Sequence, residues 1–162
     1  MSINKNRPHV LVLPEDDANR QIANGFLLDD SVDSRRIQVL HPAHGWSRVR
    51  DEFSETHRDE MDRYPLRHMV LLVDFDGRAK RLDDVKRVIP SHLADRVFIV
   101  GVWSQPEKLS GFFGGLEAIG KSIAGDCRSK GDDSWNHELL RHNSSEVRRM
   151  TQVLRPILFP SE

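Results

Sequence analysis

Five acidic side chains directly follow two apolar stretches of the sequence, where carboxylates could do chemistry. Glu15, Asp16 and Asp17 come after HVLVLP, and Asp74 and Asp76 come after RHMVLLV. Carboxylates that gather at one point repel one another, and a hard divalent cation such as Mg²⁺ relieves this repulsion by taking their oxygens as ligands. We therefore expect a divalent-metal site, provided that the fold brings the two acidic stretches together.

The elements that must position these acids alternate along the chain between strand and helix. Apolar runs predict strands at 9–14, 35–42, 67–77 and 95–103. Helical periodicity predicts helices after Asp16 or Asp17, at 46–64, at 81–93 with an interruption at Pro90, at 115–127, and from Asn143, where Glu146 completes a capping-box spacing. Continuous Val, Ile and Leu runs separated by helices indicate an α/β fold, with a mostly parallel central sheet covered by helices on both faces.

The carboxyl ends of parallel strands share one edge of a sheet, and ligands bind in the crevice at that edge. If the first and third strands are neighbours, Glu15, Asp74 and Asp76 converge there. The two aspartates are two residues apart, so an extended backbone places them on the same side, with Phe75 turned into the core. Gly77 then allows a sharp turn.

A glutamate after the first strand and a D-x-D after the third resemble the Toprim domain of topoisomerases, primases, recombination proteins and overcoming-lysogenization-defect nucleases. The resemblance covers residues 9–105 and implies a Toprim-like, Rossmann-like core. Residues 106–162 then form a helical C-terminal extension, and the whole chain, 1–162, is interpreted as a single domain.

The resemblance also implies an activity and its residues. Glu15, Asp74 and Asp76 would be the catalytic metal ligands, holding Mg²⁺ or Mn²⁺ to cut phosphodiester bonds or for a related phosphotransfer. Lys108, preceded by Glu107, stands where nuclease-type members carry a lysine after the fourth strand. The implied partner is nucleic acid, DNA in preference to RNA.

Two other functions fit the same residues. The opening strand and helix are similar to those of two-component receiver domains, in which Asp16 and Asp17 would hold Mg²⁺, Asp74 would accept a phosphoryl group, and Ser104 would follow the fourth strand. A partner-binding α/β module without chemistry is the other alternative. Independently of the function, Asp16 and Asp17 are interpreted as helix caps, a common role for aspartates at this position, and are left out of the catalytic set.

The composition and charge of the chain bear on its possible binding partners and on its location. The 162 residues carry a formal net charge of −1, which argues against a general polyanion binder, although RAKRLDDVKR offers a local basic face. We therefore expect a protein partner or a homodimer to supply more of the phosphate-binding surface.

A single cysteine, Cys127, and the lack of a long apolar segment predict a cytoplasmic protein without membrane attachment. His41 and His44 lack the further ligands that a zinc site requires.

Overall fold

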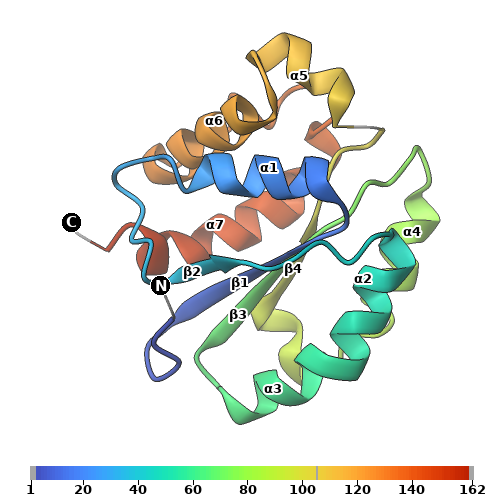
Figure 1. The fold of residues 1–162 in the computed structure, drawn as a ribbon, viewed down its shortest axis with the longest axis vertical. Helices are drawn as coiled ribbons and strands as arrows, with labels where there is room; N and C mark the ends of the chain where they lie inside the picture. The colour runs from blue at the N-terminus through green and yellow to red at the C-terminus, as the bar shows by residue number, and fades with distance from the viewer. Residues whose placement is uncertain (1–2, 105, 161–162) are drawn as a thin grey trace.

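Four parallel strands form the centre of the computed structural model (Figure 1), which describes residues 3–104 and 106–160. Residue 105, the predicted end of the Toprim-like core, lies outside the described residues. The strands are β1 (His9–Pro14), β2 (Ile37–Val39), β3 (Arg67–Leu72) and β4 (Val97–Val100). Their order across the sheet is β2-β1-β3-β4, and each neighbouring pair is parallel. The predicted α/β class is confirmed, and β1 and β3 are neighbours.

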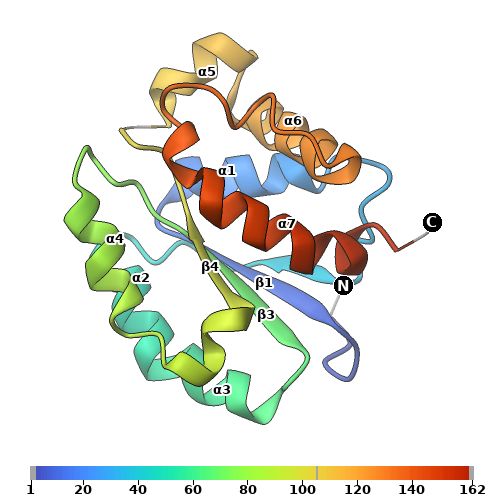
Figure 2. The same cartoon turned by 180° about the vertical axis from the view of Figure 1, so that it is seen from behind.

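Helices cover both faces of this sheet, as Figures 1 and 2 show. The helical segments are α1 (Asp17–Phe26), α2 (Trp46–Glu52), the π-helical turn η1 (Phe53–His57), α3 (Arg58–Arg63), α4 (Ala79–Lys86), the 3₁₀ turn η2 (Ser91–Arg96), α5 (Glu107–Phe113), α6 (Leu116–Ser129), the 3₁₀ turn η3 (Arg141–Asn143) and α7 (Ser144–Leu158). Within the described part of the chain, none of these helices combines the length and the apolar character needed to cross a membrane.

Alternate residues of the strands enter two separate hydrophobic cores. Val10 and Val70 point to the face covered by α1, α6 and α7, whereas Leu11 and Met69 point to the face covered by α2, α3 and α4. Side chains alternate between the two sides of a strand, so a strand buried on both faces needs apolar residues at every position. The continuous apolar runs in the sequence follow from this two-sided burial.

Several predicted boundaries differ from the structure. The helix predicted at 46–64 contains the π-helical turn η1, and the helix predicted at 81–93 ends at Lys86, before Pro90. Proline has no backbone N–H and its ring disfavours a helix that continues through it. The helix α5 was not predicted, because the glycines near it indicated a turn instead of a helix.

The helices of the predicted C-terminal extension pack against the rest of the fold. Helix α6 packs on α1, and α7 runs beside the outer strand β4 (Figure 2). The predicted capping box at α7 is wrong, because Asn143 makes no side-chain capping bond. Instead, the Asn143 amide bonds to both the N–H and the carbonyl of Gly101, and a Glu146 carboxylate oxygen accepts from the Ile99 N–H at 2.9 Å. These side chains satisfy backbone groups that the edge of β4 would otherwise leave unpaired.

Candidate metal centre

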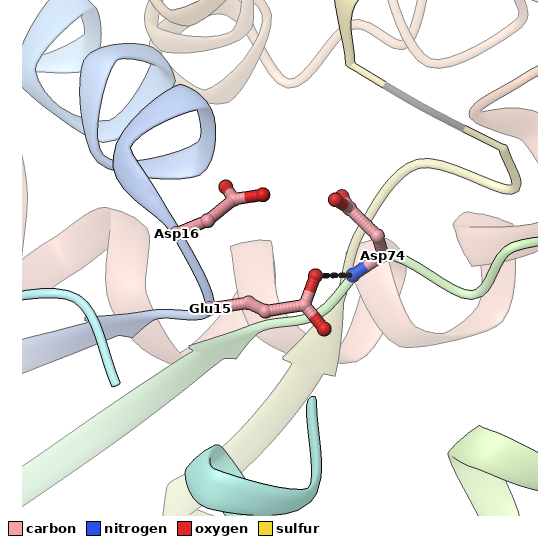
Figure 3. A group of neighbouring side chains, drawn as sticks. All are labelled: Glu15, Asp16 and Asp74. Carbon is pink, nitrogen blue, oxygen red and sulfur yellow. Dashed lines mark hydrogen bonds between the residues drawn. The ribbon is translucent and has the colours of Figure 1, made fainter. Parts of the chain in front are cut away.

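Three carboxylates meet where β1 and β3 end side by side. Glu15, Asp16 and Asp74 each offer an oxygen, and the three oxygens lie within 4.8 Å of one another. Figure 3 shows the Asp16 and Asp74 carboxylates facing each other, with Glu15 reaching beneath them. Glu15 and Asp74 converge because β1 and β3 pair in parallel. The pairing extends one residue beyond β1, where the Glu15 N–H donates to the Leu72 carbonyl at 2.9 Å.

Asp16 has two roles at the start of α1. It is the N-cap residue, with an extended backbone (φ −147°), and its Oδ1 accepts from the Asn19 N–H at 2.9 Å. Such a bond satisfies one of the free N–H groups at a helix start. The interpretation of Asp16 as a cap is therefore confirmed. The same side chain also belongs to the acidic group, whereas the exposed Asp17 is bonded to Gln21 and lies outside it.

Asn19 connects two of the three carboxylates. Its side-chain amide nitrogen donates to Asp16 Oδ1 at 2.9 Å and to Asp74 Oδ1 at 3.0 Å, and the residue is only 2% exposed. An amide NH₂ has two hydrogens, so both bonds can exist together. Asn19 therefore fixes the separation of the two aspartates and lessens their repulsion.

Glu15 is held through its backbone as well as its carboxylate. Its carbonyl accepts from the N–H groups of His44 and Gly45, at 2.7 and 3.2 Å, and its Oε2 accepts from the Asp74 N–H at 3.3 Å. His44 and Gly45 have positive φ angles of 69° and 138°, which turn both N–H groups toward this carbonyl. The loop after β2 thus fixes Glu15 from the side opposite β3.

Burial and mutual repulsion disfavour ionisation of this group. Burial, together with the nearby negative charges of Glu15 and Asp16, raises the pKa of Asp74 to about 8, although the Asn19 hydrogen bond lowers it. Burial also raises the pKa of Glu15. Without a cation, the group therefore holds at least one proton near neutral pH.

The donor set fits a hard divalent cation. All three side chains offer carboxylate oxygens, the ligand type that Mg²⁺, Mn²⁺ and Ca²⁺ take in proteins, whereas zinc sites more often use Cys or His. A divalent charge at this point would also favour the ionised carboxylates over their protonated forms.

Asp76 is not part of the group of three. Its φ is 51°, so the backbone leaves the extended conformation that would have kept it on the same side as Asp74. The side chain is half exposed and pairs with Arg81 at 3.6 Å. Arg81 also donates to the Asp74 carbonyl at 2.8 Å and lies over the Trp46 ring. A role of Asp76 in metal binding stays a prediction.

Lys108 lies exposed in the first turn of α5, next to Glu107. Neither residue belongs to the acidic group, and the predicted catalytic role of Lys108 stays a prediction. His41 and His44 are likewise outside any group of three or more metal-ligating side chains among the described residues.

Two residues that organise the site, Asn19 and Arg81, were not among the predicted site residues. Asn19 follows the helix cap by three positions, which is the spacing at which a side chain returns to the N-terminal turn and which could have drawn attention to it. Arg81 lies in a basic stretch interpreted only as a local basic face. No feature of that stretch distinguishes Arg81 from its basic neighbours, because its partners lie in the loop after β3.

Comparison of this chain with protein-family models, curated proteins and solved structures finds no match.

Proposed function

We propose that this protein is a divalent-metal-dependent enzyme that cleaves phosphodiester bonds in nucleic acid, with Glu15, Asp16 and Asp74 as the metal ligands. The observation that carries the proposal is the meeting of three carboxylate oxygens within 4.8 Å of one another, in a group that is largely buried. The Toprim resemblance supports it through Glu15 and Asp74, and the group differs from that pattern by including Asp16 in place of Asp76.

The position of the group in the fold also supports this function. In open α/β sheets, ligands bind at the carboxyl ends of the strands, where neighbouring strands connect in opposite directions across the sheet. In the order β2-β1-β3-β4 this point lies between β1 and β3, where the acidic group lies. The crowded carboxylates are consistent with a site that is completed by a cation.

In this proposal, some residues of the chain bind or position the metal ion, and others stabilise the negative charge of the substrate. A bound Mg²⁺ or Mn²⁺ supplies Lewis-acid activation of a phosphate and a water molecule. Asn19 keeps Asp16 and Asp74 at a fixed separation, and Arg81 keeps the Asp74 backbone in place. Lys108 is the proposed cation that offsets charge developing on the phosphate.

Cleavage of supercoiled plasmid and single-stranded oligonucleotides, with Mg²⁺ or Mn²⁺, tests the proposal. We expect the wild type to cut, and Asp74→Asn and Glu15→Gln to lower the rate about a hundredfold or more, because each removes a charged ligand. Asp16→Asn tests the third ligand in the same assay, and Asp76→Asn tests the D-x-D prediction.

Asp59→Asn is the matched control, because Asp59 lies exposed on α3, away from the acidic group. It should cut at the wild-type rate. Melting temperatures of all variants show whether each one is folded. A wild type that cuts neither substrate with either metal, or cutting that survives Asp74→Asn, would refute the proposal.

A second candidate function is a phosphoacceptor domain similar to receivers. The strand order β2-β1-β3-β4 corresponds to the first four strands of the flavodoxin-like arrangement, and an acidic pair after β1 faces Asp74 after β3. In the structure this pair is Glu15 and Asp16, in place of the predicted Asp16 and Asp17. Incubation with a small phosphodonor and Mg²⁺, followed by intact mass measurement, distinguishes the candidates. A phosphoryl adduct that Asp74→Asn abolishes, without nucleic-acid cleavage, favours this second function.

A further inference from the structure

A surface hollow of about 450 Å³ opens beyond the carboxyl end of β4, at the same edge of the sheet as the acidic group. It is lined by Trp103, Glu138, Leu139, Arg141 and His142. Its volume falls within the range of about 300–1,000 Å³ that is usual for ligand pockets. None of the lining residues has a part in the metal centre.

The segment that carries Asp74 also connects it to this hollow. Phe75 follows Asp74 directly, and its buried ring makes an edge contact with the His142 ring at 5.2 Å and lies 6.5 Å from the Trp103 ring. Two residues later, the Gly77 N–H donates to the Trp103 carbonyl at 2.6 Å. The hollow therefore begins within a few residues of the metal centre.

The hollow is lined by two aromatic side chains, Trp103 and His142, and by two charged ones, Glu138 and Arg141. Trp103 is partly exposed, and its ring lies 5.3 Å from the His142 ring. The backbone N–H of Trp103 donates to the Leu139 carbonyl at 2.8 Å. Arg141 is exposed at the rim. Aromatic rings and arginine side chains form the surfaces on which unpaired bases stack, because every base presents a π-face.

We propose that this hollow binds an unpaired base of a single-stranded nucleic acid, stacked on Trp103, while Arg141 contacts that nucleotide. The inference rests on the proposed function for the placement of the neighbouring phosphate at the acidic group. It specifies the substrate class as single-stranded, since the bases of a duplex are stacked on one another and can enter such a hollow only after being flipped out.

Binding of a short fluorescein-labelled single-stranded oligonucleotide, followed by anisotropy in EDTA, tests this site without cleavage. We expect Trp103→Ala to weaken binding about tenfold or more, because stacking on the ring is lost. Trp103→Phe keeps an aromatic ring and should bind within about threefold of the wild type. Arg141→Ala should weaken binding about two- to fivefold.

Arg58→Ala is the control, because Arg58 is an exposed arginine on α3, outside the hollow. It should bind like the wild type. Because Trp103 also packs against the core, circular dichroism of each variant checks folding, and the exposed Arg141 tests the hollow without disturbing the core. Tighter binding of the single strand than of the matching duplex is expected.

Three results would overturn the inference: no binding by the wild type, equal binding by wild type and Arg141→Ala, or a preference for the duplex. The assay contains no metal, so it is separate from the cleavage test. Binding that depends on Trp103 and Arg141, in a protein that does not cut, would refute the enzyme and keep the base site. If the protein cuts nucleic acid but its binding does not depend on Trp103 or Arg141, the enzyme proposal is kept and the base site is refuted.

Discussion

Asp74 lies in an environment that disfavours its ionised form. It is 9% exposed, Glu15 and Asp16 are its neighbours, and the Asn19 amide offsets their negative charge only in part. Burial raises the pKa of Asp74 to about 8, far above the 3.8 of a free aspartate side chain. If a cation binds here as proposed, its binding should depend on pH, because the cation must displace the proton of this carboxyl group.

Without metal, this carboxyl group should make stability fall as pH rises. A raised pKa in the folded state means that the group stabilises the fold below about pH 4, and that this contribution is lost as pH rises toward about 8. We expect the melting temperature of the wild type in EDTA to fall between these values. Asp74→Asn should show a weaker fall, since its amide does not ionise.

Thermal unfolding of both proteins across this pH range, followed by circular dichroism, is the measurement. Asp59→Asn serves again as the control and should follow the wild type. Parallel curves for the wild type and Asp74→Asn would contradict the environment described for Asp74.

At the element scale, two close contacts place the helices that support the site. A Cβ at Gly25 in α1 would lie 2.0 Å from the Glu117 carbonyl oxygen, and a Cβ at Gly120 in α6 would lie 1.8 Å from the Ile22 carbonyl oxygen. Only glycine permits this approach of the two backbones. Asn19 lies on the same helix α1 that α6 packs against.

Gly120→Ala should destabilise the fold although alanine is the better helix former. The added methyl group meets backbone atoms of α1 that cannot rotate away, so α6 must shift, and we expect the free energy of unfolding to fall by about 1–3 kcal/mol or more. Urea denaturation measures the change.

Gly111→Ala in α5 is the matched control. A Cβ at Gly111 meets nothing within 4 Å, and alanine raises helix propensity by up to about 1 kcal/mol. This variant should therefore be as stable as the wild type or slightly more stable. Equal stability of both alanine variants would mean that α1 and α6 are not in close contact.

At the scale of the whole molecule, the proposed metal site predicts a link between metal binding and folding. The three carboxylates come from two places far apart in the sequence, Glu15 and Asp16 at the start of α1 and Asp74 after β3, so an unfolded chain does not hold them together. A cation that binds only the folded state stabilises it by mass action. A cation held by these three carboxylates would therefore stabilise the whole fold.

Mg²⁺ or Mn²⁺ should raise the melting temperature of the wild type at pH 8. At a metal concentration about one hundred times the dissociation constant, the gain is about 2.7 kcal/mol, which corresponds to about 5–10 °C for a domain of this size. The same titration on Asp74→Asn should give a much smaller shift. An equal shift in both proteins would place the metal elsewhere.

The pattern of residue types is enough to predict the class of fold and two of the three clustered carboxylates. Continuous apolar runs predicted strands buried on both faces, and acids directly after the first and third runs predicted that Glu15 and Asp74 approach one another. Both predictions depend on short-range patterns of burial, which a sequence records directly. The pairing of the two strands was the condition, and the structure meets it.

Which other side chains join Glu15 and Asp74 depends on the three-dimensional packing of the chain. A single positive φ at Asp76 rotates that side chain out of the group, while the N-cap conformation of Asp16 turns its carboxylate in. Asn19 and Arg81 gain their roles from partners more than fifty residues away or in a neighbouring loop. Individual backbone angles and long-range contacts arise from the packing of the whole chain, and no local pattern of residue types specifies them.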